Sequence, residues 1–162
     1  GNFKIGDTLT EGEILNFKGI PSFSPEHFRY VNNADPMKAK QLFKGLDQLM
    51  DEGVAQLFTL DMNGRKVIGT VGALQYEVIQ YRLEHEYGAK CSYENLQVHK
   101  ACWVEPEDPK NEEFKEFKRV KQRYLAKDKQ GQLVFLADSS FTIQMTQSKY
   151  PTVKLHFVSE YK

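Results

Sequence analysis

Cysteine and histidine side chains are the first residues to consider for chemistry, because they ligate metals and act as nucleophiles and bases. The two cysteines, Cys91 and Cys102, have one histidine near them, His99. A structural zinc site needs about four ligands at short, characteristic spacings, and these three residues do not provide them. The pattern favours two reduced thiols in a cytosolic fold over a metal site.

Three short motifs resemble parts of active sites. In Glu84-His85-Glu86, neighbouring helix positions point about 100° apart, so the side chains do not converge. Asp138-Ser139-Ser140 is more typical of a helix cap than of a nucleophile. Gly69-Thr70-Val71-Gly72 lacks the lysine of a phosphate-binding loop. The residues therefore predict no catalytic residue, no cofactor-binding residue and no metal ligand.

A cluster of basic residues is the feature best suited to meeting phosphates. Its members are Lys115, Lys118, Arg119, Lys121, Arg123, Lys127 and Lys129. Glutamates at 112, 113 and 116 dilute this cluster. Two interpretations stay open: a nucleic-acid contact centred on Lys118, Arg119, Lys121 and Arg123, or a solvated helix face whose charges match the helix dipole.

Composition narrows the class of protein. Twenty-two basic residues balance twenty-two acidic ones, so any contact with nucleic acid must be local. Hydrophobic residues make up 40% of the chain, which suffices for a folded core. No apolar run approaches membrane-spanning length and no signal-like leader opens the chain. We therefore expect a monomeric cytoplasmic protein without a membrane partner.

The elements that position these residues follow from periodicity and turn signals over residues 28–98. The sequence predicts, in order, a strand over 28–31, a helix from Asp35-Pro36 to Gly53, a strand over 55–60, a hairpin turn at Asn63-Gly64, a strand over 66–71, a helix over 74–87 closed by Gly88, and a strand over 91–98. This βαββαβ order predicts an α+β fold: a two-layer sandwich with both helices on one face of an antiparallel sheet, as in ferredoxin-like domains.

The second of these helices carries a surplus of apolar residues. Leu74, Val78 and Tyr81 share one face, while Tyr76, Ile79 and Leu83 lie on a neighbouring face. Tyr76, Ile79 and Tyr81 are candidates for an interface with another domain. The alternative is that both faces are buried between the sheet and the C-terminal residues.

The residues on either side of this unit predict further elements. Residues 99–105 indicate a strand, Asn111 caps a helix that continues through Tyr124, and residues 132–137 and 153–157 indicate strands. Residues 140–149 favour a helix capped by Ser139 or Ser140, although the alternation of Phe141, Ile143 and Met145 would suit a strand. Residues 1–13 are typical of the end of a preceding β domain, and 19–25 of a linker. No internal sequence repeat is evident.

Several segments carry a family likeness. The chain resembles the C-terminal part of bacterial peptide chain release factor three, a class II release factor of the translational GTPase family. The matching segments are Lys4-Ile5-Gly6-Asp7-Thr8-Leu9-Thr10-Glu11-Gly12, Phe17-Lys18-Gly19-Ile20-Pro21, Gln41-Leu42-Phe43-Lys44-Gly45-Leu46, Gly72-Ala73-Leu74-Gln75-Tyr76-Glu77-Val78, Trp103-Val104-Glu105 and Tyr150-Pro151-Thr152-Val153. The βαββαβ unit also looks like the third domain of elongation factor G, whereas the residues beyond Ala101 distinguish the release factor.

The resemblance implies a division of roles in a longer parent protein. Residues 1–20 would be the remnant of a preceding β-barrel and its linker, and residues 21–162 the C-terminal domain, divided into the βαββαβ unit (21–99) and an α/β extension (100–162). The G domain that binds GTP and magnesium would be missing, so we expect no enzymatic activity and no cofactor here.

The expected partners also follow from the resemblance. They are the ribosome (protein and rRNA), indirectly the class I release factors that the parent factor removes after termination, and, within the parent, the G domain and the barrel. The alternatives are the corresponding domain of another translational GTPase or an independent α+β enzyme.

Overall fold

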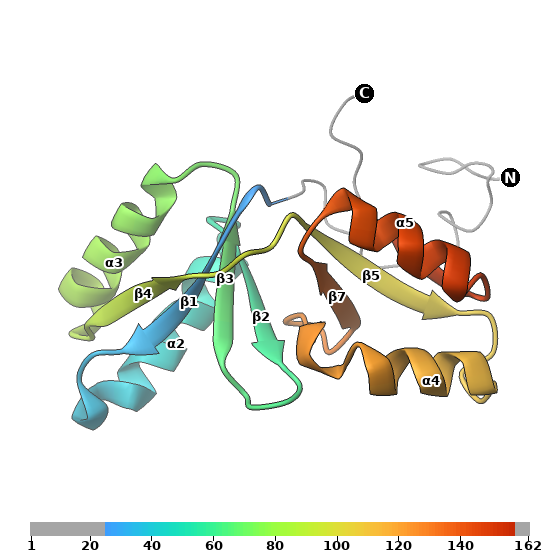
Figure 1. Ribbon diagram of the computed structural model, residues 1–162. Coiled ribbons are helices and arrows are strands. Elements are labelled where there is room, and N and C mark those ends of the chain that lie inside the picture. Colours follow the sequence, from blue (N-terminus) through green and yellow to red (C-terminus); the bar gives the residue numbers. More distant parts are fainter. Residues whose placement is uncertain (1–24, 158–162) are drawn as a thin grey trace, which may run out of the picture.

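The computed structural model describes residues 25–157 and contains two similar units that follow one another along the chain (Figure 1). The barrel remnant and linker predicted for residues 1–20 lie outside the described residues. In the described part of the chain, no helix is long and apolar enough to cross a membrane.

The first unit has the predicted βαββαβ order. Its elements are β1 (His27–Asn33), the 3-10 helix η1 (Pro36–Lys38) with α2 (Ala39–Asp51), β2 (Gln56–Leu60), β3 (Lys66–Thr70), α3 (Leu74–Tyr87) and β4 (Cys91–Asn95). The strands lie side by side in the order β4-β1-β3-β2, and every neighbouring pair is antiparallel. This is the ferredoxin-like arrangement that the sequence predicts.

The capping and turn residues predicted from the sequence lie at the ends of the helices and in the β2–β3 turn. The Asp35 carboxylate accepts a hydrogen bond from the backbone N–H of Met37 at 3.1 Å, which caps η1. Gly53 and Gly88 follow α2 and α3 with φ angles of 83° and 66°, a conformation that favours glycine. Gly64 has a φ of 75° in the β2–β3 turn. Local chemistry therefore fixes the boundaries of the first unit.

The α/β extension predicted for residues 100–162 repeats the βαββαβ plan of the first unit. Its elements are β5 (Lys100–Pro106), α4 (Glu112–Val120), the 3-10 helix η2 (Gln122–Tyr124), β6 (Leu125–Lys127), β7 (Leu133–Ala137), α5 (Ser140–Lys149) and β8 (Val153–His156). The strand order β6-β7-β5-β8 is that of the first unit read from the other edge. The residues after β5 therefore complete a second four-stranded unit with β5, two helices included.

Two local predictions in this unit have different outcomes. The Ser139 hydroxyl accepts a hydrogen bond from the N–H of Thr142 at 3.1 Å, so residues 140–149 form the predicted helix and not a strand. The helix predicted to run through Tyr124 ends at Val120 instead. Leu125 adopts an extended conformation and begins β6, a three-residue strand that the sequence pattern does not reveal. The chain must leave the helix early to supply this strand.

The two units are joined edge to edge into one eight-stranded sheet. The junction pairs β2 with β6 through Thr59 opposite Lys127 and Leu60 opposite Ala126. Each unit has a core between its sheet and its own helices, one centred on Leu46 and Ile79 and the other on Phe117. A third core lies between the helix-free faces of the two half-sheets and contains Phe28, Phe58, Leu60, Val67, Ala101, Trp103, Ala126, Val134 and Leu136.

The third core shows how the sheet is bent. The rings of Phe58 and Trp103, which come from different units, have centroids 6.0 Å apart. The Trp103 indole N–H also donates to the Asp128 carboxylate at 2.9 Å. The sheet therefore folds at the β2–β6 junction so that the helix-free faces meet, with α2 and α3 on one side and α4 and α5 on the other (Figure 1).

Candidate functional site

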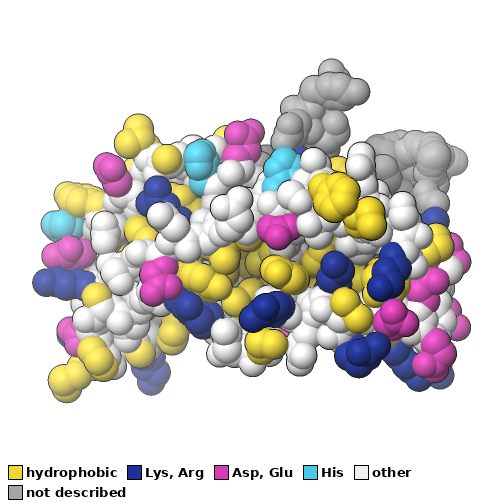
Figure 2. Space-filling model, viewed as in Figure 1, with side chains coloured by type: hydrophobic (Ala, Val, Ile, Leu, Met, Phe, Trp, Pro, Cys, Tyr) yellow, Lys and Arg dark blue, Asp and Glu magenta, His cyan; other side chains and the backbone are white. Residues whose placement is uncertain are grey.

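A cavity of about 290 Å³ lies where the helix-free faces of the two units diverge. Its lining combines apolar side chains with amide, phenol and guanidinium groups from both units: Tyr30, Leu60, Met62, Asn63, Leu96, Gln97, Val98, Arg123, Tyr124 and Leu136. Figure 2 shows hydrophobic surface in the hollow between the two halves of the molecule, with basic side chains beside it. Concave sites with a few polar groups are typical of ligand binding.

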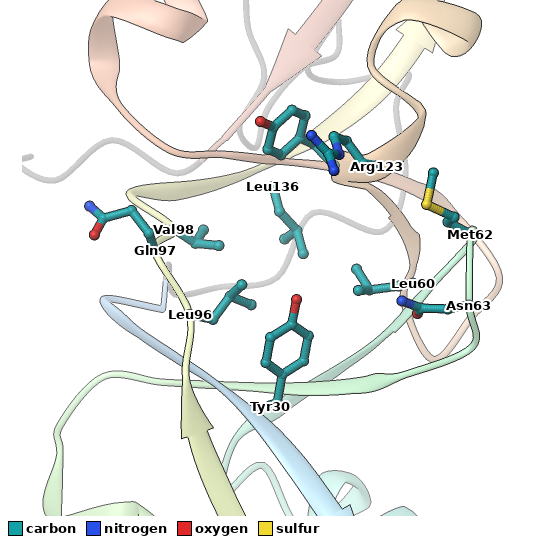
Figure 3. Close-up of a pocket in the computed structure, with 10 residues that line it drawn as sticks. Tyr30, Leu60, Met62, Asn63, Leu96, Gln97, Val98, Arg123 and Leu136 are labelled. Atoms are coloured by element: carbon teal, nitrogen blue, oxygen red, sulfur yellow. The ribbon is translucent and has the colours of Figure 1, made fainter.

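Tyr30 forms one wall of the cavity, and its hydroxyl points inward between Leu96 and Leu60 (Figure 3). The Arg65 guanidinium covers the Tyr30 ring at 3.7 Å from the centroid. Arg65 is held in turn by Glu94 at 2.7 Å and by the Asn32 side chain at 3.1 Å. The Tyr30 hydroxyl has no hydrogen-bond partner among the described residues. Its ring is thus fixed while its polar end stays available.

The opposite rim comes from η2 of the second unit. Arg123 and Tyr124 lie there because α4 ends at Val120 and the chain turns towards β6. The Tyr124 ring packs edge-on against Phe135, with 6.4 Å between centroids, and 38% of the residue stays exposed. Arg123 is exposed, and no acidic group in the described residues pairs with it. Arg123 is therefore a free cation at the mouth of the cavity.

The other predicted phosphate-binding residues do not form a single stripe. Lys118 lies over the Phe114 ring at 4.5 Å, and Lys121 over the Phe135 ring at 6.0 Å. Arg119 is exposed and, within the described residues, makes no ion pair. Basic and acidic side chains mix over the part of the surface where α4 lies (Figure 2). The structure brings only Arg123 to the cavity, and the contact predicted for all four stays a prediction.

The candidate interface on α3 separates into two groups. Tyr76 and Ile79 are 1% and 0% exposed, and the Tyr76 hydroxyl donates to the carbonyl of Ile68 at 2.6 Å. These two residues pack in the first core, so their assignment to an interface was wrong. Tyr81 is 63% exposed and lies with Leu74 and Val78, which are 72% and 47% exposed. The surface available for a partner is therefore the face formed by these last three.

The motifs that resembled active sites have structural roles. The two cysteine thiols are buried in different cores, and burial raises the pKa of Cys102 to about 12. His85 stacks on Tyr81 at 4.0 Å between ring centroids. The Ser139 hydroxyl caps α5, and the N–H of Gly72 donates to the Gln75 side chain at 2.9 Å.

The Glu86 carboxylate of the Glu84-His85-Glu86 motif forms an ion pair on α3. Glu86 pairs with Arg82 at 2.8 Å, and that contact lowers the pKa of the Glu86 carboxyl. Among residues 25–157, no three His, Cys, Asp or Glu side chains lie close enough together to hold a metal ion.

Most of the cavity residues were missed in the sequence. Tyr30 alternates with Val31, and Trp103 with Val104, so each strand places apolar side chains on both faces. Strands that are apolar on both faces indicate that the second face is covered as well. That signal could have predicted contact between the two helix-free faces.

The family model for the class II release factor RF3, C-terminal domain, matches residues 17–147 of the 162. The chain belongs to this family. The match includes the first unit and most of the second, through α5 up to Gln147. The chain is therefore a release-factor domain of the RF3 type of translational GTPase, a class that acts in translation termination, and its function is related to the ribosome.

Proposed function

We propose that this domain engages the ribosome and couples that contact to the nucleotide state of a G domain elsewhere in the parent protein, so that class I release factors dissociate after termination. The observation that carries the proposal is the third core, which joins the two units side chain to side chain. Coupling between two distant surfaces requires an element that transmits orientation, and a shared core supplies one.

The first of these surfaces is the exposed face of α3. Leu74, Val78 and Tyr81 are spaced four and three residues apart, so they form one apolar stripe on the side of the first unit away from the sheet. An exposed apolar stripe of this kind suits a contact with another protein domain. We assign it to the G domain or the β-barrel of the parent protein.

The second surface is the basic end of the second unit. Arg119 and Arg123 have no acidic partner among the described residues, and Lys118 and Lys121 lie beside them along the chain. Unpaired guanidinium groups bind phosphate in a bidentate manner. We assign this end to ribosomal RNA and adjoining ribosomal protein. The chain itself would not hydrolyse GTP, and GTP and magnesium would belong to the G domain.

Sedimentation of the chain with ribosomes over a series of salt concentrations tests this proposal. Replacing Arg119 and Arg123 together by Gln should weaken binding and reduce the slope of log K against log salt by about 1.4–1.8, since each lost phosphate contact removes about 0.7–0.9. Lys40→Gln with Lys44→Gln, an equal charge change on α2 of the first unit, is the matched control. Binding that is insensitive to both salt and the arginine substitutions would contradict the proposal.

A domain of elongation factor G is the second candidate, since its third domain has the ferredoxin-like arrangement. The family match continues past the first unit into the second. That continuation favours the release factor, because the second unit supplies both the basic end and half of the third core.

A further inference from the structure

We propose that the cavity between the two units binds one unstacked nucleobase of single-stranded RNA. This inference rests on the proposed ribosome contact and gives that contact a chemical form. Base recognition in RNA relies on aromatic side chains or Arg planes that stack on the base, and on polar groups that meet its edges. The cavity provides each of these.

The position of the cavity in the fold is the first argument. It lies on the helix-free face of a ferredoxin-like sheet, with Tyr30 projecting from the central strand β1. A four-stranded sheet with aromatic side chains on its open face is a known platform for stacked bases. In this chain, the second unit packs on that face through the third core, and the cavity of about 290 Å³ lies beside the packed part with Tyr30 in its wall.

The polar groups around the opening are the second argument. The hydroxyl of Tyr30 and the amide of Gln97 have no hydrogen-bond partner among the described residues. Asn63 uses its side-chain oxygen to accept from the N–H of Arg65 at 3.0 Å, so its amide N–H groups remain for a ligand. The Tyr30 hydroxyl points into an apolar interior formed by Leu60, Leu96 and Leu136, whereas Gln97 lies at the edge of the cavity with its amide directed outward (Figure 3). A nucleobase, which has apolar faces and polar edges, fits a cavity with an apolar interior and polar groups at its wall.

Charge is the third argument. Two acidic groups close to the cavity along the chain form ion pairs: Glu94 with Arg65 at 2.7 Å and Asp61 with Lys127 at 3.3 Å. The Asp138 carboxylate, near Leu136, accepts a hydrogen bond from the Thr142 hydroxyl at 2.6 Å. Arg123 is the charged residue of the lining, and it is unpaired within the described residues. A guanidinium at the mouth would meet the phosphate of the nucleotide whose base is inside. This arrangement favours a nucleotide over an apolar side chain of a partner protein.

Tyr124 is the residue that separates stacking from phosphate attraction. Its ring is partly exposed at the rim, so Tyr124→Ala removes a stacking surface without opening a buried core. Phe141→Ala is the matched control, because Phe141 is an exposed aromatic residue on α5 that does not line the cavity. Tyr124→Phe keeps the ring and should keep binding. Equal melting temperatures of the variants would show that each is folded.

The experiment measures fluorescence anisotropy of a labelled single-stranded RNA hexanucleotide with the whole chain, beside the same RNA with one abasic position. Because Tyr124→Ala removes one stacking contact, this variant should bind the intact RNA with an affinity about 5- to 150-fold lower than that of the unchanged chain. Tyr124→Ala and the unchanged chain should bind the abasic RNA with equal affinity, because that RNA lacks the base that stacks on Tyr124. Arg123→Gln should weaken binding to both RNAs and lower the salt dependence.

Three results would overturn the proposal. The first is equal affinity of the unchanged chain for intact RNA and for RNA made abasic at each position in turn, which would leave the phosphate contact and the proposed function standing. The second is an absence of binding at millimolar RNA. The third is loss of ribosome binding by Tyr124→Ala with no change in RNA binding, which would identify a protein side chain as the occupant. Failure of the chain to sediment with ribosomes would instead contradict the proposed function itself.

Discussion

Phe58 is the residue through which the joining of the two units can be tested most directly. It is fully buried, and its ring lies 6.2 Å from that of Phe28 in its own unit and 6.0 Å from that of Trp103 in the other. Phe58→Ala removes the ring from the third core while leaving the helices, the turns and the strand register untouched. We expect this change to destabilise both units together.

The expected size of the effect follows from burial and ring contacts. A buried phenylalanine removes about 150–250 Å² from water, and large-to-small changes of this type cost about 3–5 kcal/mol. Each lost ring pair adds about 0.5–1.5 kcal/mol beyond burial, which places Phe58 at the upper end. For a chain of this length, about 2–4 °C in Tm corresponds to each kcal/mol, so Tm should fall by about 8–20 °C.

The assay combines urea unfolding with native-state hydrogen exchange. Phe117→Ala is the control, because Phe117 is also fully buried but packs only in the core of the second unit. Phe58→Ala should lower the protection of amides in α2 and in α5 by the same free energy. Phe58→Leu, which keeps a branched apolar side chain, should lower the amide protection of α2 and α5 equally but by a smaller free energy. This variant replaces Phe58→Ala in the experiment if the Ala variant does not fold.

Unequal losses would refute this reasoning. If Phe58→Ala lowered protection in β1 to β4 and left β5 to β8 as before, the units would unfold independently. The third core would then be a contact between separate domains. The proposal that one surface transmits orientation to the other would lose its structural basis.

Three further predictions concern local features. Gly45→Ala should lower the free energy of unfolding in urea by about 1 kcal/mol. The new Cβ would lie 2.7 Å from the buried Leu83 side chain, and this overpacking, about 1–3 kcal/mol, outweighs a gain in helix propensity of about 1 kcal/mol. Asn111→Ala should cost about 1 kcal/mol in the same assay, because its side chain accepts the N–H of Phe114 at 2.7 Å, and Asn111→Asp should restore most of it. Burial raises the pKa of Tyr76 to about 12 from 10.0. The neutral hydroxyl therefore contributes fully to the free energy of unfolding below pH 10, and this contribution is lost as the pH rises through 12. The free energy of unfolding should fall by up to about 2–3 kcal/mol over that window, and Tyr76→Phe should reduce the fall.

The first unit was predictable because local signals and burial agree there. Asp35, Gly53, Gly64 and Gly88 fix the turns, and Leu42 and Leu46 recur at the spacing of a buried helix face. The assignment of Tyr76 and Ile79 failed for a different reason. Helix periodicity shows that a face is apolar but not what covers it, and the sheet covers both residues here.

The second unit was only partly predictable, because its shortest strand carries little pattern. Leu125–Lys127 becomes a strand through its partners, β2 on one side and β7 on the other, both distant in sequence. Without β6 the four-stranded order cannot be recognised, and the repeat stays hidden since the two units differ in sequence. The cavity was missed as a consequence, because it exists only where the two units meet.

The junction between the units owes its strength to side chains rather than to its ladder. Two residue pairs join β2 to β6, too few to resist bending by themselves. Lys127 with Asp61 at 3.3 Å and Lys129 with Asp51 at 2.7 Å add exposed ion pairs, which contribute little and weaken with salt. The apolar contact of Phe58 with Trp103 persists in salt. Under the proposed function, any nucleotide-dependent rotation should therefore occur outside residues 25–157, with the two units moving as one body and the cavity keeping its shape.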